Sequence, residues 1–587
     1  MHILLVAVNA KYIHSNPAVH SLKSCAGEYA AHISILEFTI NQQPFFILQE
    51  IYKKQPDVIA FSCYIWNYSL IGQIIPDLHK ILPDTDFWAG GPEVSYNAPD
   101  VIKSWQLRGV MTGPGENSFC RLAAAYINGC ADSLPAILEA GPPHAADGRR
   151  LLDDIPFWYE DKDQADFSHR IIYYESSRGC PFSCSYCLSS IDRTMDFRST
   201  DRVCRELDFF LSRKVPQVKF VDRTFNCRKS HALSILKHIL EHDNGITNFH
   251  FEVAADLLDE DYFALLSQMR PGAVQLEIGV QSTNARTIEE IDRRMDFGKV
   301  AAAVLRLRSF HNIHIHLDLI AGLPFEDLPS FQQSFNEIYA LRPQQLQLGF
   351  LKVLKGSRMA LRAPGYNLVY TSQPPYEVLS TKWLSFDDIC RLKQIEELVE
   401  LYYNSGQFTH TLEFLLQSFD SPYALFESLA LWYDQHGCFG IQSSRVRRYE
   451  LLLEFAAAPD TLSILTECLT YDLYLREHMK NRPAFCLPID QWKDEIHKIL
   501  HQESESHTLF PAASFPNLAI CSYRELTKTL HAEVFRVLFG QPVIVLFYYG
   551  RRDPLTNNCA AYRTIYINKE NGRKDCSDTL QIKPDFN

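Results

Sequence analysis

The sequence lacks any apolar run of about 18 residues, which is the length that a membrane-crossing helix requires. Its start, MHILLVAVNAKYIHSNP, is apolar for only a few residues and has no basic segment before them. This pattern predicts a first β-strand and not a secretory signal. We therefore expect a cytoplasmic protein that does not enter a membrane.

Positive charge is also scarce, because 57 Lys and Arg residues stand against 70 Asp and Glu residues, a net charge of -13. This balance argues against broad binding to a nucleic-acid backbone, although it is compatible with a local basic groove. The 587 residues are too many for one hydrophobic core, so we expect two to four domains. The 16 cysteines are scattered, and without an export signal they are expected to be reduced thiols.

A fourth cysteine is missing from the tight cluster SSRGCPFSCSYCLSS (176–190), which holds only Cys180, Cys184 and Cys187. Half of a zinc site is one interpretation, but zinc sites pair CxxC with a second such pair, and the sequence has none. A second interpretation is that the three cysteines are ordinary residues of a hydrophobic core. The glycine, proline and serine of this stretch, however, suit an exposed loop better. We favour a four-iron four-sulfur (4Fe–4S) cluster with three thiolate ligands and one open iron.

Residues 1–145 alternate short apolar segments with helical ones, which predicts an α/β domain with an open, doubly wound, Rossmann-like sheet. Residues 146–167 form a predicted linker, in a region rich in glycine, proline and alanine. The strands of the first domain are expected at 2–8, 32–38, 57–64 and 86–91, with a helix at 70–82.

The alternation restarts over residues 168–370, where six strand–helix units predict a partial (β/α)6, TIM-like barrel. Its active site is expected at the carboxyl ends of the strands, where polar residues gather. Residues 371–587 are expected to form a mostly helical domain with strands only near its end, and they contain no catalytic constellation. The barrel strands are expected at 171–179, 217–225, 249–258, 274–282, 313–324 and 345–354.

The CxxxCxxC loop, with Tyr186 just before its last cysteine, resembles the radical S-adenosylmethionine (SAM) superfamily. Later stretches are similar to strand-end motifs of the subgroup that carries an amino-terminal cobalamin (B12)-binding domain. The resemblance covers roughly residues 1–370, and the tail from PPYEVLST resembles a family-specific domain of unknown function. The stretches are FVDRTFN (220–226), FHFEVAAD (249–256), EIGVQS (277–282), HLDLIAGLPFED (316–327) and LGFLKVLKGS (348–357).

The resemblance implies that SAM binds the open iron through its amino and carboxylate groups. An electron from an external donor of the flavodoxin or ferredoxin type would reach the cluster and cleave SAM to a 5′-deoxyadenosyl radical. The cofactors would carry the difficult chemistry, while the protein supplies binding, orientation and exclusion of water. The resemblance also implies that Tyr186 lies beside the cofactor.

Two carboxylates are candidate SAM contacts. Asp222 follows an apolar strand and would accept a hydrogen bond from the methionine ammonium group. Its alternatives are a helix N-cap or a salt bridge to Arg223 or Arg228. Glu252 alternates with apolar neighbours, so we expect it to point into the barrel toward the ribose hydroxyls, with a buried ion pair as its alternative.

Two further strands end in polar residues. In EIGVQS, Gln281 and Ser282 suit ribose or carboxylate contacts, and capping of the next helix is the alternative for Ser282. On the next strand His314, His316 and Asp318 share one face by strict alternation. A metal site is conceivable there, but we favour a polar lining of the barrel.

The first domain places Ser62, Gly90 and Gly91 at strand ends, where Rossmann-like cobalamin domains cradle the nucleotide tail and the corrin ring. VMTGPGENSF (110–119) resembles the GEGE turn of such domains, and a helix is expected to begin at Asn117 or Ser118. The common motif DxHxxG is absent around His14, because tyrosine and proline replace its aspartate and glycine. We predict that His14 does not bind cobalt. A degenerate flavodoxin-like domain without cobalamin remains an alternative.

Together these features predict a cobalamin-dependent radical SAM enzyme that methylates an unactivated carbon of a small-molecule or peptide substrate. A radical SAM enzyme for rearrangement or ring closure is the first alternative. A methylthiotransferase-like RNA-modifying enzyme without cobalamin is the second, although the cysteines of the first domain form no tight motif for another cluster. A non-enzymatic iron–sulfur protein is disfavoured because it would not need polar groups at the strand ends.

Overall fold

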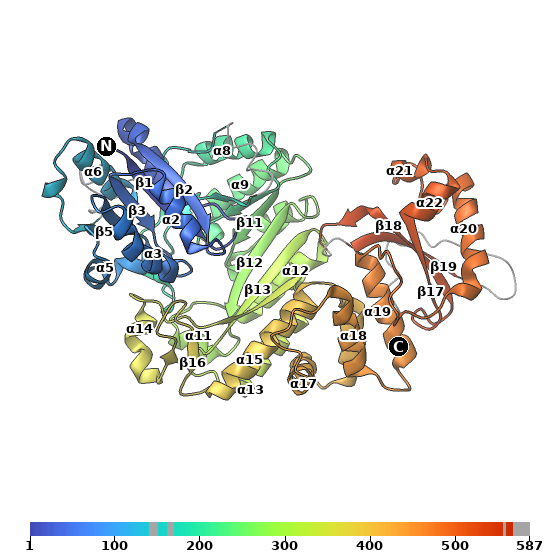
Figure 1. Cartoon of the computed structure of the whole chain (residues 1–587). Helices are drawn as coiled ribbons and strands as arrows, with labels where there is room; N and C mark the ends of the chain where they lie inside the picture. The colour runs from blue at the N-terminus through green and yellow to red at the C-terminus, as the bar shows by residue number, and fades with distance from the viewer. Residues whose placement is uncertain (140–150, 161–169, 192, 556–558, 567–587) are drawn as a thin grey trace. The chain divides into compact units, whose positions relative to one another are not determined.

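The computed structural model describes residues 1–139, 151–160, 170–191, 193–555 and 559–566 (Figure 1). They divide into two compact units. The first comprises Met1–Ser334 and Gly349–Ile389, and the second comprises Phe335–Leu348 and Cys390–Asn587. Much of the expected linker, residues 146–150 and 161–167, lies outside the described residues. Among the residues described, none of the helices is both long and apolar enough to span a bilayer.

The amino-terminal part of the first unit is built on a six-stranded sheet in the order β2-β1-β3-β4-β5-β6, with parallel pairing throughout. The expected open, doubly wound sheet is therefore confirmed. Its strands are β1 (Ile3–Asn9), β2 (Ile33–Thr39), β3 (Val58–Ser62), β4 (Asp86–Gly90), β5 (Gly109–Thr112) and β6 (Ile137–Glu139).

Helices cover both faces of this sheet, and every residue of β1 is buried. Leu4, Val6 and Val8 join one hydrophobic cluster with α2, α3 and α5, whereas the alternate residues of β1 join a second cluster with α1 and α6. The continuous apolar run of β1 follows from this burial on both sides. The helices are α1 (Pro17–Cys25), α2 (Pro44–Tyr52), α3 (Tyr68–Ile81), α4 (Pro92–Ser95), α5 (Ala98–Trp105) and α6 (Gly115–Ile127).

The start of α6 differs from the expectation of Asn117 or Ser118. The helix begins at Gly115, because the chain is still extended at Pro114 and turns helical directly after it. The acidic residue of its first turn is Glu116.

A second six-stranded sheet has the order β14-β13-β12-β11-β10-β7. In the described residues β14 and β7 form its two edges, so the sheet is an open, partial barrel, as predicted. Its strands are β7 (Ile172–Tyr174), β10 (Gln217–Phe220), β11 (Asn248–Glu252), β12 (Val274–Gln281), β13 (Ile313–Ala321) and β14 (Gln345–Phe350). The main helices between them are α8 (Thr200–Ser212), α9 (Lys229–Glu241), α10 (Glu260–Leu266), α11 (Ala285–Glu290), α12 (Phe297–Ser309) and α13 (Leu328–Ala340).

The strands at the centre of this sheet alternate in burial. Along β12 every second residue from Val274 is buried, and the residues between them are only partly buried. The register pairs Gln275 with His314, Glu277 with His316 and Gly279 with Asp318. Because side chains of paired residues point to the same face of a sheet, one face of β12 and β13 carries the polar residues.

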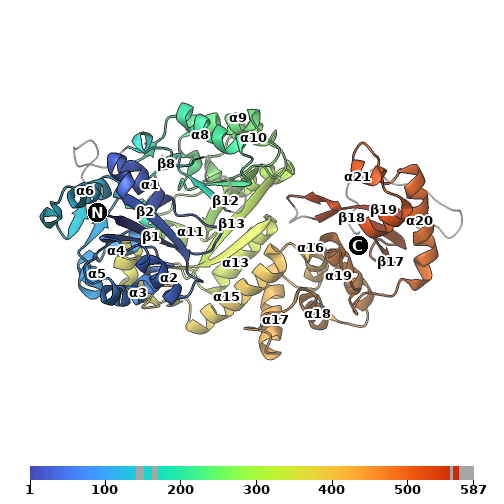
Figure 2. The same ribbon diagram turned by 45° about the horizontal axis from the view of Figure 1, so that its top comes forward.

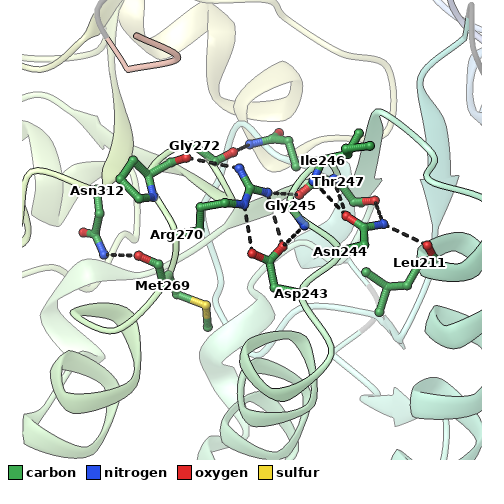
Figure 3. A network of polar contacts seen from close by, with 12 residues as sticks. Leu211, Asp243, Asn244, Gly245, Ile246, Thr247, Met269, Arg270, Gly272 and Asn312 are labelled. Carbon is green, nitrogen blue, oxygen red and sulfur yellow. Dashed lines mark hydrogen bonds and ion pairs between the residues drawn. The ribbon is translucent and has the colours of Figure 1, made fainter. Parts of the chain in front are cut away.

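The loops that precede these strands are tied together by hydrogen bonds (Figure 3). Arg270 Nε donates to Asp243 Oδ2 at 2.8 Å, and Asn312 Nδ2 donates to the Met269 carbonyl oxygen at 2.8 Å. Asn244 Nδ2 donates to the Leu211 carbonyl oxygen at 2.8 Å. These contacts fix the amino-terminal edge of the sheet and leave its carboxyl ends for chemistry.

The second unit is mostly helical and ends in a three-stranded antiparallel sheet in the order β17-β18-β19 (Figure 2). Helices and two strands near the end were predicted here, whereas the edge strand β17 was not. The elements include α16 (Thr409–Leu415), α17 (Pro422–Gln435), α18 (Arg445–Ala456), α19 (Leu462–Arg476), α20 (Lys493–Ser506), α22 (Tyr523–Thr529), β17 (Leu530–Phe535), β18 (Val543–Asp553) and β19 (Cys559–Tyr566).

Candidate active site

The cysteine loop follows β7 and the short strand β8 (Ser177–Arg178). Cys180 and Cys184 are buried, and Cys187 is partly exposed. Gly179 has a φ of 97°, and an added Cβ would lie 2.2 Å from the Thr194 carbonyl oxygen. Only glycine can therefore occupy this position without moving the backbone, which fixes the direction in which the loop leaves the strand.

A partly buried arginine lies against the loop. Arg293 Nη1 is 3.6 Å from Cys184 Sγ and 3.5 Å from the Tyr186 hydroxyl, and its Nη2 donates to the Gly279 carbonyl oxygen. A cation beside a thiolate stabilises the negative charge that a metal ligand must carry. Arg293 was not among the predicted site residues, because nothing in IDRRM distinguishes it from a surface arginine.

Asp222 is wholly buried at the end of β10. It accepts hydrogen bonds from the Ser176 backbone N–H at 2.8 Å and from the hydroxyls of Ser176 and Ser177, each at 2.6 Å. These bonds replace both alternatives considered for it, the helix N-cap and the salt bridge to a neighbouring arginine. Burial raises the pKa of Asp222 to about 6, although the serine hydrogen bonds act in the opposite direction. The carboxylate thus joins the end of β10 to the chain entering the cysteine loop.

Glu252 ends β11, and among the described residues no hydrogen bond or ion pair holds its carboxyl group. The buried ion pair considered for it is therefore not formed. Burial raises the pKa of Glu252 to about 7, which the charge of Arg223 opposes and that of Glu277 reinforces. A carboxyl group with this pKa is partly ionised near neutral pH, and its ionised form accepts hydrogen bonds from a ligand.

Gln281 and Ser282 differ in their hydrogen-bond partners. Gln281 has a φ of 73°, and its Oε1 is buried without a hydrogen-bond partner. Its amide folds over Gly279, whose added Cβ would lie 2.3 Å from Gln281 Nε2. Ser282 Oγ donates to Glu326 Oε1 at 2.5 Å. The helix-capping alternative for Ser282 is wrong, because Asn284 caps α11.

The polar face of the sheet holds a network of ion pairs. His316 Nε2 is 2.9 Å from Asp318 Oδ1, whereas His250 Nε2 and Lys219 Nζ are 2.8 and 3.0 Å from Glu277 Oε2. Burial would raise the pKa of Glu277, but the His250 hydrogen bond and the Lys219 charge hold it at about 2. Burial also lowers the pKa of His314 to about 4. The groups compensate one another, as a polar lining would, although Glu277, His316 and Asp318 have the spacing of metal ligands.

A cavity of about 870 Å³ lies within the first unit, between the carboxyl ends of its two sheets. Ser62, Gly90 and Gly91 line it from the first sheet, and Gly179 of the cysteine loop lines it from the second. Gly91 has a φ of 111°, and an added Cβ would lie 2.4 Å from the Cys63 carbonyl oxygen, whereas Gly90 has ordinary space. The structure thus places the residues predicted for cobalamin and the backbone of the cysteine loop around one cavity, whereas Asp222, Glu252 and Gln281 do not line it.

His14 also lines the cavity, and its Nδ1 lies 2.6 Å from the Tyr173 hydroxyl. A hydrogen-bond partner is therefore present, although the aspartate expected from DxHxxG is not. Tyr173 is 159 residues away in the sequence, so no local motif could reveal the pair. Burial and the charges of Lys11 and Lys219 lower the pKa of His14.

A partly buried ion-pair cluster connects the chain before the cysteine loop to α6 of the first domain. Arg178, on β8 directly before the cysteine loop, places Nη2 2.9 Å from Glu116 Oε1 on α6. Its Nε and Nη2 also bond Glu175, at 2.9 and 2.7 Å. Because Glu116 lies in the first turn of α6, this cluster anchors the cysteine loop to the first domain.

Comparison with known families identifies both halves of this site. The B12 binding domain matches residues 3–123, and the radical SAM superfamily matches residues 174–338. The chain therefore carries an amino-terminal B12-binding domain followed by a radical SAM domain. A protein family of unknown function (DUF4080) matches residues 364–545, which places a further domain after the barrel.

The sequence is 25% identical over 336 residues to the cobalamin-dependent radical SAM methyltransferase TokK of Streptomyces tokunonensis, covering 51% of this chain and 47% of that protein. It is 26% identical over 291 residues to the hopanoid C-3 methylase of Methylococcus capsulatus, covering 47% and 55%. The chain thus spans about half the length of these relatives. The fold is similar to that of OxsB, a cobalamin-dependent SAM radical enzyme solved with aqua-cobalamin bound, at a TM-score of 0.54 and 12% identity over 80% of each chain.

The two domains imply a 4Fe–4S cluster, SAM and cobalamin as cofactors, as the sequence predicted. The residues fit these groups. Three thiols occupy a loop with a compensating guanidinium, which suits a thiolate-bound cluster. On the second sheet, Gln281 offers a buried acceptor without a partner, and Glu252 has no hydrogen bond or ion pair among the described residues; the cavity meets the glycine-lined end of the first sheet. Radical SAM enzymes as a class require a reductant and a substrate.

Proposed function

We propose that this protein is a cobalamin-dependent radical SAM methyltransferase that methylates an unactivated carbon. The observation that carries this proposal is the single cavity shared by the cysteine loop and the predicted cobalamin cradle. When bound, the cluster and SAM supply a 5′-deoxyadenosyl radical, and cobalamin supplies the methyl group. Because both groups would act on one substrate carbon, they must meet in one water-restricted space.

The residues of the chain then have separate tasks. Cys180, Cys184 and Cys187 hold the cluster, and Arg293 offsets their negative charge. Glu252 accepts hydrogen bonds from the SAM ribose, and the unpaired Oε1 of Gln281 accepts another. Asp222 orients the chain that enters the cysteine loop through its bonds to Ser176 and Ser177, so its predicted contact with the methionine ammonium would come from the same fixed carboxylate.

Ser62, Gly90 and Gly91 support the corrin ring and nucleotide tail in this proposal, and His14 does not bind cobalt. The hydrogen bond to Tyr173 engages Nδ1 of His14 and directs its ring toward β7. Electron paramagnetic resonance of the cobalt(II) form should therefore show no triplet splitting from a histidine nitrogen, and His14→Ala should leave the spectrum unchanged. A nitrogen splitting that disappears in His14→Ala would assign this residue as the ligand.

The substrate in this proposal is a small molecule or peptide, and the electron donor is of the flavodoxin or ferredoxin type. A reducing, cytoplasmic location would keep the thiols of Cys180, Cys184 and Cys187 available to the cluster. A 4Fe–4S cluster with an open iron also requires protection from oxygen.

The test is anaerobic purification and reconstitution, followed by measurement of corrinoid content, 5′-deoxyadenosine and transfer of the labelled SAM methyl group. Bound corrinoid together with a methylated product supports the proposal. 5′-Deoxyadenosine formation without any bound corrinoid would instead favour the methylthiotransferase-like alternative. Bound corrinoid and 5′-deoxyadenosine with an unmethylated product would favour rearrangement or ring closure.

A further inference from the structure

The charged side chains that line the 870 Å³ cavity are almost all paired. Arg178 binds both Glu116 and Glu175, and Arg198 binds Glu206 together with the carbonyl oxygens of Glu175 and Ile155. Arg223 is different. Its carbonyl oxygen accepts a hydrogen bond from the Thr224 hydroxyl, but among the residues that the structure describes its guanidinium has no hydrogen-bond, ion-pair or ring partner, and its side chain is exposed at the cavity.

The backbone that presents Arg223 is held on both sides. Asp222 before it is buried and bonded to Ser176 and Ser177, and Thr224 after it is buried with its hydroxyl 3.7 Å from Cys180 Sγ. A long, flexible side chain thus projects from a fixed point, one residue from a group that contacts the cysteine loop. An unpaired arginine in such a position is available to a ligand.

Arg223 lies between the two halves of the site. Burial raises the pKa of Tyr64, which follows β3 of the first sheet, and that of Glu252 at the end of β11 in the second, and the charge of Arg223 opposes the rise at both. The cavity wall near Tyr64 is aromatic, because Tyr64 and Trp66 stack with ring centroids 4.4 Å apart. Trp158 lines the same cavity and stacks on Tyr159.

We propose that the substrate is an anion with an apolar body, and that its carboxylate or phosphate group pairs with Arg223. This inference rests on the proposed function, since it takes the cavity as the place of reaction. The planar guanidinium forms two parallel hydrogen bonds to either oxyanion, and such pairs are stronger than neutral hydrogen bonds. The aromatic walls would contact the apolar body and position its carbon between the two cofactor sites.

The competing role for Arg223 is contact with a cofactor, either the SAM carboxylate or the corrin side chains. The two roles differ in which affinity depends on the arginine. A cofactor contact would lower SAM affinity or corrinoid content when the arginine is removed. A substrate contact would leave both within about threefold and remove the preference for anionic ligands.

The experiment compares three probes of similar shape, phenylacetate, phenyl phosphate and the neutral phenylacetamide, by calorimetric titration of the reconstituted holoprotein. We expect at least one anion to bind at least tenfold more tightly than the amide. Arg223→Gln should abolish this preference, and Arg223→Lys should retain part of it. Arg228→Gln is the matched control, because Arg228 is also exposed but stacks on Phe197 and does not line the cavity.

The proposal is overturned if the wild-type protein shows no preference for either anion, or if Arg223→Gln keeps the wild-type preference. A loss of SAM affinity or corrinoid in Arg223→Gln with the anion preference intact would assign Arg223 to a cofactor. A preference for only one of the two anions would identify the acidic group. Corrinoid content and 5′-deoxyadenosine are measured on the same wild-type samples, so their absence would reject the proposed function separately from the anion site.

Discussion

The protein contains two parallel sheets of six strands each, and the two use their faces differently. In the first sheet both faces are apolar and covered by helices, so β1 is buried over its whole length and chemistry is confined to the strand ends. In the second sheet one face carries Lys219, His250, Glu277, His316 and Asp318 in a network of ion pairs. The first sheet therefore acts as a scaffold, whereas the second presents a chemical surface along its strands.

This difference follows from whether helices cover both faces of the sheet. A sheet packed between two helical layers has no face left for polar groups, because unpaired buried charges are costly. An open barrel keeps its inner face available, and charged groups are tolerated there when they pair with one another. The two sheets should therefore respond differently to substitution: the first in stability, and the second in cofactor binding.

The largest expected effect is on the second sheet. Cys184→Ala should remove the broad visible absorbance of the reconstituted cluster and abolish 5′-deoxyadenosine formation, because a thiolate ligand is lost. Cys204→Ala is the control, since Cys204 lies on α8 and outside the loop, and it should retain both properties. 5′-Deoxyadenosine formation by the Cys184 variant would contradict the cluster assignment.

A change in the core of the first sheet should act on stability. Phe61 on β3 is 2% exposed within a hydrophobic cluster, so Phe61→Ala should lower the free energy of unfolding by about 3–5 kcal/mol. Gln275→Ala on the polar face of β12 is the matched change and should stay within about 0.5 kcal/mol. Urea denaturation followed by circular dichroism measures both. Equal losses in the two variants would remove the contrast between the sheets.

The carboxyl group of Glu326, in the loop between β13 and α13, makes the stability of the folded protein depend on pH. Burial raises its pKa from 4.5 to about 7, so the folded state holds a proton that the unfolded state loses between these values. Stability should fall as the pH rises from about 4.5 to 7, by up to about 3 kcal/mol at 1.36 kcal/mol per pH unit. Glu326→Gln should remove this loss, which unfolding at pH 5 and pH 8 would measure. An unchanged pH dependence would show that Glu326 is not its source.

The smallest of the four effects concerns SAM. Glu252→Gln should weaken SAM binding roughly tenfold to a hundredfold, because a hydrogen bond to a charged group is worth about 1.5–3 kcal/mol. Wild-type affinity should rise between pH 6 and pH 8 as the carboxyl group loses its proton, and the variant should lack this rise. Asp222→Asn should weaken binding as well, while iron content stays unchanged in both. Unchanged affinity in both variants would make these carboxylates purely structural.

Several predictions from the sequence are confirmed because they depend on local periodicity. The buried run of β1 and the alternation of β12 follow directly from patterns within about eight residues. The edge strand β17 was missed because its residues do not alternate regularly in burial. The start of α6 was placed two or three residues too late because Asn117 and Ser118 resemble caps, whereas the backbone turns after Pro114.

The hydrogen-bond partners of the site residues were less predictable from the sequence. The roles of Tyr186, Gln281 and the other site residues remain predictions, but their surroundings are now defined. Asp222 was expected to cap a helix or pair with an arginine if it did not bind SAM, and it instead bonds two serines 45 and 46 residues earlier. Arg293 approaches Cys184 across 109 residues, and no local pattern marks such a contact.

The sequence by itself determined the strand–helix order of both sheets, the three-cysteine loop and the two cofactor-binding regions, because periodicity and ligand spacing are properties of short segments. Only the tertiary structure decided that Ser62 and Gly179 share one cavity, that Tyr173 bonds His14, and that Arg223 is left unpaired there. These facts depend on which strand ends meet when two sheets pack in one unit. Distances between residues far apart in the chain are set by that packing and not by any local pattern.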